Sequence, residues 1–175
     1  MNDNYGEIRM ESSQTFEQLL NLFWLRPETA MWREIDIRAM EKFKFHSPSL
    51  DLGCGDGIFS FVRAGGMFDP GYDAFRSVSN LKQFFDNVDI FDSFDNAHEA
   101  IITRPSNYKI DCGFDHKNNL LRKAEQLNLY KNLKKGDANK PLPFNDESFK
   151  SIFSNIIYWL DEPESAIKEI ARKLI

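Results

Sequence analysis

The 175-residue sequence has few of the residues that build metal sites or disulfide frameworks. It contains two cysteines, Cys54 and Cys112, and three histidines that lie far apart. Neither residue type has the short spacing of zinc ligands, so we predict no metal site. The first residues are polar and lack the apolar core of a secretory signal peptide. Together with the low cysteine count, this predicts a cytoplasmic, reduced protein.

Long hydrophobic runs and excess positive charge are also missing. No apolar run approaches the roughly 20 residues of a membrane-spanning helix. Lys and Arg number 22 against 27 Asp and Glu, which gives a net charge of −5. Because phosphate binding depends on Lys and Arg, this balance argues against a nucleic-acid partner, although a local basic patch for RNA stays open. The length and the 42% hydrophobic content predict one globular domain.

The spacing of apolar residues predicts strands that alternate with helices. Two helices are expected first, at 14–24 and at 27–43, the second opened by Pro27. The later elements are a strand at 48–53, a helix at 56–64, a strand at 107–115, a helix at 117–129, strands at 130–136 and 148–155, and a helix from Glu162. Residues 67–106 are expected to be irregular apart from a helix at 78–87. The alternation indicates an α/β fold whose parallel sheet is covered on both faces.

The stretch DLGCGDG, residues 51–57, is the most informative motif. Its glycines occupy alternate positions, whereas the dinucleotide fingerprint is G-x-G-x-x-G with an acid about 20 residues later. Here the first suitable acid, Asp115, lies 58 residues beyond Gly57. A phosphate-binding P-loop is also excluded, because no Gly-Lys-Ser/Thr follows.

The acids of this loop indicate the kind of ligand. Asp51 and Asp56 would repel a pyrophosphate. S-adenosylmethionine suits them better, because it carries a sulfonium, an ammonium and a carboxylate but no phosphate. The helix N-terminus at Asp56–Ile58 would supply amide donors for that carboxylate. In parallel sheets ligands bind beyond the C-terminal strand ends, where the glycine loop, Asp115, Asp137 and Asn155 are all expected.

The loop resembles motif I of the class I S-adenosylmethionine-dependent methyltransferases. CGFD at 112–115 resembles the acid that ends their second strand. GDANKPLPFNDESFKSIFSN at 136–155 resembles their adenine loop and fourth strand, and DEPESAIKEIARKL at 161–174 resembles the next helix of the small-molecule "type 11" branch. The likeness covers about 50–64 and 107–174. It implies a Rossmann-like core with about four strands in the order 3-2-1-4, flanking helices and an N-terminal helical pair.

The resemblance also implies S-adenosyl-L-methionine as the cofactor and a role for each matching residue. The glycines would line the methionine portion, and Asp51 would support the loop amides and attract the ammonium. Asp115 would accept hydrogen bonds from the ribose, Asp137 would receive the adenine amino group beside the Ala138 amide, and Asn155 would lie beside the transferring methyl. The implied cofactor-binding residues are Asp51, Gly53, Cys54, Gly55, Gly57, Asp115, Asp137, Ala138 and Asn155.

Plainer explanations stay open for the same residues. Asp115 can cap the helix that follows it, Asp137 can belong to a turn, and Asn155 can satisfy backbone groups at a strand end. Asp111 is a weaker ribose candidate because it is expected in mid-strand. The two cysteines are expected to be small packing residues, since no base for a nucleophilic thiol is evident.

The expected domain, 1–175, has three parts. Residues 1–47 form N-terminal helices or a lid, in which Trp32 and Arg33 would face the cofactor. Residues 48–66 and 107–175 form the cofactor-binding core. Residues 67–106 form a Phe-rich insert, which either packs its rings on the body as a flap or covers the substrate.

Two departures from the family pattern matter. The family core has seven strands, and this sequence stops after the fourth strand and its helix. A fragment, a truncated gene, or a homo-oligomer completed through the exposed sheet edge would each explain the difference. Many relatives also place Glu-His where Trp159 and Leu160 stand here, so no catalytic residue is assigned.

The resemblance implies methyl transfer to a small-molecule, lipid or glycan intermediate. The alternative from a different functional class is a truncated, inactive domain that binds the cofactor or serves in assembly. A nicotinamide-dependent oxidoreductase is disfavoured by the glycine spacing and by Asp51.

Overall fold

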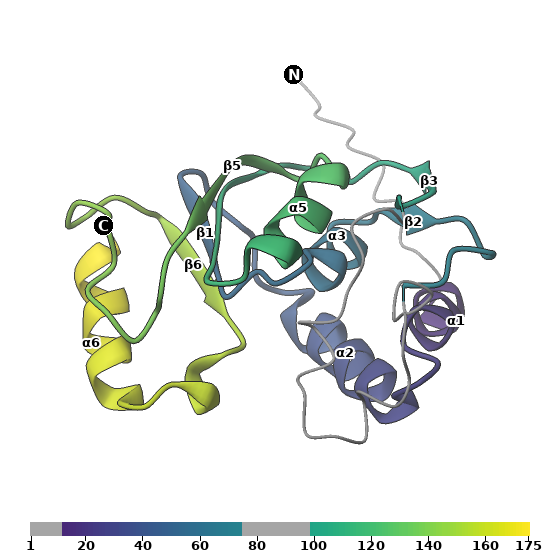
Figure 1. Cartoon of the computed structure of the whole chain (residues 1–175), viewed down its shortest axis with the longest axis horizontal. Helices are drawn as coiled ribbons and strands as arrows, with labels where there is room; N and C mark the ends of the chain where they lie inside the picture. Colours follow the sequence, from purple (N-terminus) through teal and green to yellow (C-terminus); the bar gives the residue numbers. More distant parts are fainter. Residues whose placement is uncertain (1–11, 75–98) are drawn as a thin grey trace.

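A parallel four-stranded sheet forms the centre of the molecule in the computed structural model, which describes residues 12–74 and 99–175. Its strands are β1 (Ser49–Leu52), β4 (Ile110–Asp115), β5 (Tyr130–Lys135) and β6 (Ser151–Ser154). They lie in the order β5-β4-β1-β6, and every neighbouring pair is parallel (Figure 1). Counted along the chain, this is the predicted order 3-2-1-4, so the expected fold class is confirmed.

The central strand β1 is buried along its whole length, as expected for a parallel strand covered on both faces. Leu50 and Leu52 point to one face, where they join a core cluster with Phe114 of β4. Asp51 points to the opposite face and contacts Ser60. Because side chains alternate between the two faces along β1, the buried Asp51 carboxylate lies beneath α3, the helix that follows the glycine loop.

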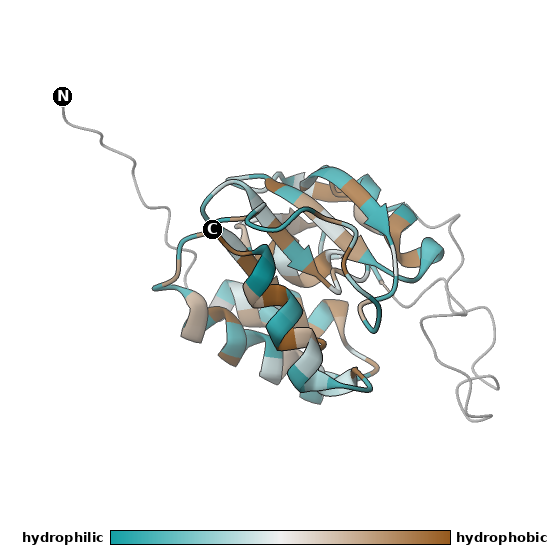
Figure 2. Cartoon of the chain, turned by 90° about the vertical axis from the view of Figure 1, so that its left-hand side faces the viewer, coloured by the Kyte–Doolittle hydropathy of each residue, from teal (hydrophilic) through white to brown (hydrophobic). Residues whose placement is uncertain are grey.

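Helices cover the two faces unequally. The helices of the described residues are α1 (Ser12–Leu22), α2 (Pro27–Met40), α3 (Ile58–Arg63), α5 (Asn118–Gln126) and α6 (Pro163–Lys173), with a short 3-10 turn η2 (Ile157–Trp159). One apolar cluster joins α1, α2 and α3 to the region where α5 leads into β5. The other packs Ile170 of α6 against β1 and β4. Figure 1 shows α6 apart from the group of α1, α2 and α3, and Figure 2 looks directly onto α6, whose surface mixes hydrophobic and hydrophilic residues.

The expectation of an irregular segment at 67–106 is wrong for two short stretches. β2 (Met67–Phe68) and β3 (Ile102–Arg104) pair antiparallel in a second sheet. Strands of two and three residues are too short to produce a recognisable alternation, and tertiary packing stabilises them. Phe68 is buried against Phe61 of α3, with ring centroids 4.9 Å apart. The expected helix at 78–87 and most of the Phe-rich insert lie outside the described residues.

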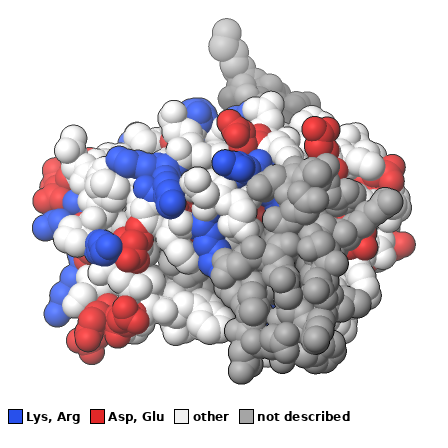
Figure 3. All heavy atoms as spheres, in the orientation of Figure 1, with Lys and Arg blue, Asp and Glu red and all other residues white. Residues whose placement is uncertain are grey.

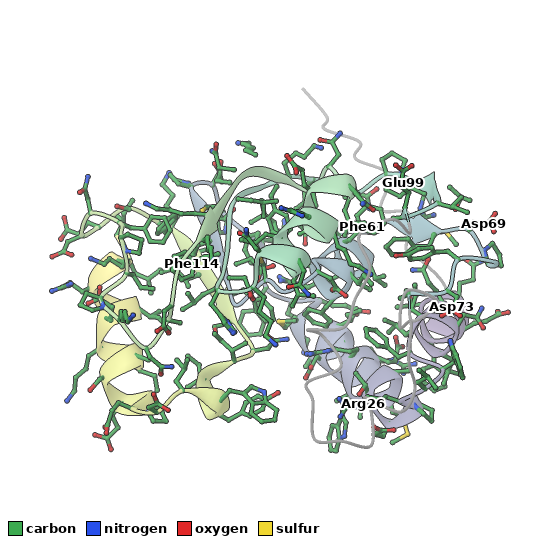
Figure 4. All side chains as sticks on the ribbon, viewed as in Figure 1. Arg26, Phe61, Asp69, Asp73, Glu99 and Phe114 are labelled. Atoms are coloured by element: carbon green, nitrogen blue, oxygen red, sulfur yellow. The ribbon has the colours of Figure 1, made fainter. Side chains whose placement is uncertain are left out.

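The largest aromatic side chains of the core belong to elements that carry the site. Figure 4 labels Phe61 on α3 and Phe114 on β4, both inside the body of the molecule, whereas Asp69 and Asp73 lie at its margin. On the face drawn in Figure 3, basic and acidic side chains both occur across the described residues. Within the part of the chain that is described, no helix is long and apolar enough to cross a membrane.

Asp111 at the start of β4 ties the sheet together away from the glycine loop. Its carboxylate accepts hydrogen bonds from the Ser49 amide at 2.8 Å and from Lys131 Nζ at 2.6 Å. Burial alone would raise the pKa of Asp111, but these donors and the Ser47 and Ser49 hydroxyls hold it at about 2. Asp111 is therefore occupied by protein donors, and it lies at the start of β4 and not in mid-strand, where it was expected.

We expect Asp111→Asn to lower the free energy of unfolding at pH 7 by about 1–2 kcal/mol. A depressed pKa in the fold stabilises it above the unfolded value near 3.8, and this contribution is lost as the pH falls toward 2. Urea unfolding of both proteins at pH 7, 4 and 2.5 should therefore show a difference that shrinks with acidity. A difference that is constant over this range would contradict the assignment.

Candidate active site

The glycine loop between β1 and α3 has a backbone that other residues adopt with difficulty. Gly53, Gly55 and Gly57 have φ angles of +81°, +56° and +76°. The amides of Gly53 and Cys54 donate to the carbonyl of Phe114 at 2.8 and 3.1 Å. The loop after β1 is thereby fixed to the end of β4.

Asp115 at the end of β4 holds this loop through its side chain. Its Oδ2 accepts a hydrogen bond from the Gly55 amide at 3.0 Å, and its Oδ1 accepts one from the Lys117 amide at 2.8 Å. The second bond reaches Lys117, which is the N-cap residue of α5 and has no side-chain cap, so Asp115 is not the N-cap of this helix. Each carboxylate oxygen can accept more than one hydrogen bond, which leaves capacity for a ligand. Asp115 is 8% exposed, at the boundary between the core and the loop.

Asp51 is buried in the structure, and hydroxyl groups satisfy its carboxylate. Its Oδ2 accepts hydrogen bonds from Ser60 Oγ at 2.6 Å and from the Tyr130 hydroxyl at 2.7 Å. Burial raises the pKa of Asp51, and these two donors oppose that rise. The prediction that Asp51 supports the loop amides is wrong for the Gly55 amide, because Asp115 makes that contact. Asp51 instead joins α3 to β5 beneath the loop.

Tyr130 is a functional-site neighbour that the sequence did not identify. Burial raises the pKa of its hydroxyl, with the nearby Asp51 charge acting in the same direction. Its ring also lies 3.0 Å from where a Cβ on Gly57 would be. A tyrosine at the start of a strand carries no signal of such a role, because the contact to Asp51 spans 79 residues.

Asp56 occupies the start of α3, where free amide donors were expected. Its Oδ1 accepts a hydrogen bond from the Ile58 amide at 3.1 Å. Burial raises the pKa of Asp56, and the positive charges of Lys123 and Arg33 oppose that rise. One amide of the helix N-terminus is therefore already satisfied by a negative group of the chain itself.

The loop after β5 brings Asp137 beside Asp115. The Gly136 amide donates to the backbone carbonyl of Asp115 at 2.9 Å. Asp137 Oδ1 accepts from the Asn139 amide at 2.9 Å, so the turn explanation holds for this oxygen. The half-exposed carboxylate also has Lys140 Nζ at 3.7 Å. Ala138 follows in the same turn and packs against the cluster around Phe114.

Asn155 lies at the end of β6 and faces an arginine of α2. With its amide oxygen turned toward the guanidinium, Asn155 accepts from two Arg33 nitrogens at 2.6 and 3.1 Å. Both residues line a cavity of about 330 Å³ between α2 and the β6–η2 segment. Of the two residues expected in the lid, Arg33 reaches this site, whereas Trp32 is 62% exposed on the surface.

The two cysteines have the character of packing residues. Burial raises the pKa of Cys112 to about 11 and raises that of Cys54 further, with nearby carboxylates adding to the effect. A thiol that stays protonated is a poor nucleophile. Cys54 therefore contributes to the loop through its backbone, which donates to Phe114.

The three glycines differ in what surrounds them, and this decides where a ligand fits. A Cβ on Gly53 would lie 2.5 Å from the Ile156 side chain. A Cβ on Gly57 would touch Tyr130, Leu127 and Ala124, whereas a Cβ on Gly55 would meet no atom within 4 Å. Open space thus lies over the one glycine whose amide is held by Asp115. This cradle fits a ligand that approaches the backbone closely, as the methionine part of S-adenosylmethionine would.

We expect Gly55→Ala to fold and to lose affinity for S-adenosylhomocysteine by about tenfold or more. The new Cβ meets no protein atom, so the cost to folding is limited to a positive φ, about 1 kcal/mol. Calorimetric titration and thermal unfolding measure the two effects. Gly53→Ala is the comparison, because its Cβ collides with Ile156 and should lower stability more. An unchanged affinity in Gly55→Ala would place the ligand elsewhere.

Comparison with known proteins agrees with this geometry. Residues 103–175 match the family model described as a methyltransferase domain. No curated protein matches the sequence. A candidate S-adenosyl-L-methionine-dependent methyltransferase from Methanococcus maripaludis superposes with a TM-score of 0.50 at 15% identity, over 99% of this chain and 63% of its own. A SAM-dependent methyltransferase from Thermotoga maritima, described as a possible histamine N-methyltransferase, gives 0.49 at 17% identity, over 89% and 55%.

The chain spans less than two thirds of the length of either structure. At these identities the superposition informs on the fold alone, and the family match adds a likeness to methyltransferase domains over residues 103–175. The chain therefore shares the fold of the Methanococcus maripaludis structure, and its residues 103–175 match the methyltransferase-domain family.

Proposed function

We propose that this chain binds S-adenosyl-L-methionine and takes part in methyl transfer to a small-molecule, lipid or glycan intermediate. The observation that carries the proposal is the pairing of Gly55 with Asp115. The Gly55 amide is fixed to the carboxylate at 3.0 Å, and the space over its Cα is open. One acidic side chain thus borders a cradle at the C-terminal edge of a parallel sheet, where such folds bind ligands.

Asp115 and the loop after β5 are placed to hold the nucleoside. The remaining acceptor capacity of the Asp115 oxygens suits the two ribose hydroxyls. Asp137 follows Gly136, whose amide donates to the backbone carbonyl of Asp115, so the two acids stand in segments that contact each other. There it would accept the adenine amino group while the Ala138 amide faces the ring. Asp51 would act beneath the loop by fixing α3 and β5 to it.

The cofactor supplies an electrophilic methyl group on sulfur and leaves as S-adenosylhomocysteine. The chain's part is to align the acceptor with that methyl, and alignment alone contributes several kcal/mol. The cavity between α2 and the β6–η2 segment is the acceptor site that we propose. Its apolar walls include Phe153 and Ile157, and Arg33 and Asp36 supply charge. Its edge holds Asn155, the residue expected beside the methyl.

Calorimetric titration with S-adenosylmethionine and S-adenosylhomocysteine tests the proposal, with NAD as the competing ligand class. We expect saturable binding of both adenosyl compounds and none of NAD. Transfer of a radiolabelled methyl group to any acceptor then supports the enzyme. Binding without transfer to a panel of acceptors supports the alternative, an inactive cofactor-binding or assembly domain. If the folded protein binds neither adenosyl compound, the methyltransferase proposal is contradicted, and the assembly-domain alternative is favoured.

Two further points belong to the same proposal. We propose a cytoplasmic location, because the sequence has only two cysteines. Self-association through β6 is supported by the position of this strand at the edge of the sheet. Sedimentation velocity of the purified chain at several concentrations tests the second point.

A further inference from the structure

The cavity between α2 and the β6–η2 segment has aromatic walls of two kinds. Phe153 of β6 is fixed, because its ring stacks on Phe59 of α3 with centroids 5.5 Å apart. Tyr158 of η2 also lines the cavity, and its ring lies 5.2 Å from that of Trp159. Tyr158 and Trp159 are 71% and 74% exposed. An apolar ring in the cavity would therefore cover aromatic surface that is open to solvent.

The size and lining of the cavity limit what can enter it. Its volume of about 330 Å³ lies at the lower end of the roughly 300–1,000 Å³ of small-molecule pockets. Met40 and Ile157 add apolar surface to the two rings. A sugar carries hydroxyl groups on every side and would leave many of them without partners against such walls. The cavity therefore suits a small, largely apolar compound better than a glycan.

Asp36 is the one carboxylate among the described residues that line this cavity. Its side chain is 46% exposed, and its ion pair with Arg33 of the same helix is long, with 3.6 Å between nitrogen and Oδ2. Hydrogen bonds between charged groups of this kind span about 2.7–2.9 Å. The carboxylate thus keeps acceptor capacity for a donor in the cavity.

Arg33 offsets the charge of Asp36 only in part, because other groups share its guanidinium. The Asn155 amide oxygen accepts from two of its nitrogens at 2.6 and 3.1 Å. Arg33 also lies near Asp56 at the start of α3, where it and Lys123 oppose the rise in pKa that burial causes. One guanidinium is therefore divided between two carboxylates, and the cavity attracts a cation more than an anion.

We propose that the methyl acceptor is a small aromatic amine, bound with its ring between Phe153 and Tyr158 and its nitrogen at Asp36. This inference rests on the proposed function, because it names the class of acceptor for that site. Among the acceptors which that function allows, it selects a small molecule over a lipid or a glycan. Asp36 is then the residue that determines specificity.

The movement of charge in the reaction agrees with an amine. The bound ammonium first releases a proton to water, and the nitrogen lone pair then forms a bond to the methyl carbon. The carbon–sulfur bond breaks with its electron pair on sulfur, so the positive charge moves to nitrogen. A carboxylate beside this nitrogen stabilises the developing charge, whereas it would repel a carboxylate or phenolate acceptor.

Three compounds with the same ring test the role of the charge. Phenethylamine, phenethyl alcohol and hydrocinnamate carry an ammonium, a hydroxyl and a carboxylate. Calorimetry measures their binding to the chain saturated with S-adenosylhomocysteine, and transfer of a radiolabelled methyl from S-adenosylmethionine measures their use as acceptors. The variants are Asp36→Asn, Asp36→Glu and the control Glu28→Gln. Glu28 lies in the first turn of the same helix with its side chain 59% exposed, in an ion pair with Arg26.

We expect the wild-type chain to bind phenethylamine at least about tenfold more tightly than the other two compounds, and to methylate it alone. Asp36→Asn should weaken phenethylamine binding by about 5- to 20-fold, because it removes a charged acceptor at a partly exposed position. Its affinities for phenethyl alcohol and S-adenosylhomocysteine should stay within about twofold of wild type, as should all affinities of Glu28→Gln. Asp36→Glu should keep part of the amine binding, since it retains the charge.

The contrary results are distinct. If phenethyl alcohol or hydrocinnamate binds as tightly as phenethylamine, or if none of the three binds, the inference fails while binding of S-adenosylhomocysteine upholds the proposed function. It fails in the same way if phenethylamine binds but receives no label. If Asp36→Asn weakens all ligands equally, Asp36 acts through the fold and not on the amine. If the wild-type chain does not bind S-adenosylhomocysteine, the proposed function itself fails, and the acceptor class fails with it.

Discussion

Asp115→Ala is expected to lower the affinity for S-adenosylhomocysteine by at least about 100-fold. The substitution removes the acceptor for the ribose hydroxyls, and each hydrogen bond to a charged group contributes about 1.5–3 kcal/mol. It also frees the Gly55 amide, which is bonded to Asp115 at 3.0 Å, so the cradle over Gly55 loses its anchor. Calorimetric titration measures the loss directly.

Two controls show whether the loss concerns the ribose. Asp111 lies on the same strand, but its carboxylate is bonded to Ser49 and Lys131, so Asp111→Ala should leave the affinity within about threefold. A ribose-deoxygenated analogue of S-adenosylhomocysteine should bind the wild-type chain weakly, and Asp115→Ala should weaken it further only by the part of the loss that comes from the freed Gly55 amide. Additive losses from the analogue and the variant would instead mean that Asp115 does not contact the ribose. Circular dichroism must first show that the variant folds.

The fold could be predicted from the sequence because its information is local. The strand β1 is followed by a glycine and β4 ends in an acid, and the helices have apolar residues at helical spacing. The order of the strands was implied by the family resemblance alone. The ends of the elements were less accurate: β6 covers Ser151–Ser154, whereas 148–155 was expected. The strands β2 and β3 were not predicted, because stretches of two or three residues show no periodicity.

The site could be predicted only in part, because some of its contacts join residues that are distant in the sequence. Asp115 and Asp137 end strands in a recognisable motif, and the structure puts their loops in contact through the Gly136 amide. The Tyr130 hydroxyl on Asp51 and the Arg33 guanidinium on Asn155 are contacts between distant segments. No spacing rule connects such residues, so only their packing reveals them. The buried position of Asp51 likewise depends on α3 and β5 closing over it.

Phe114→Ala is expected to lower the free energy of unfolding by about 3–5 kcal/mol. The side chain is 1% exposed and packs edge-on against Phe144 with ring centroids 5.7 Å apart. Its removal leaves a cavity between β4 and the loop after β5, which carries Asp137 and Ala138. Chemical unfolding measures the effect, and Phe43→Ala, at a side chain that is 71% exposed, should change stability by less than about 0.5 kcal/mol.

The contact with Gly136 makes the Phe114 ring important for the site as well as for stability. A Cβ on Gly136 would lie 2.3 Å from Cζ of Phe114, so Gly136→Ala must displace the ring or the loop, at a cost of about 1–3 kcal/mol. In the double variant with Phe114→Ala, the added methyl enters the space that the ring has left. The double variant should therefore be more stable than the sum of the single losses predicts, by about 1 kcal/mol or more. Strict additivity would mean that the two residues do not touch, and the packing that places Asp137 beside Asp115 would then need another cause.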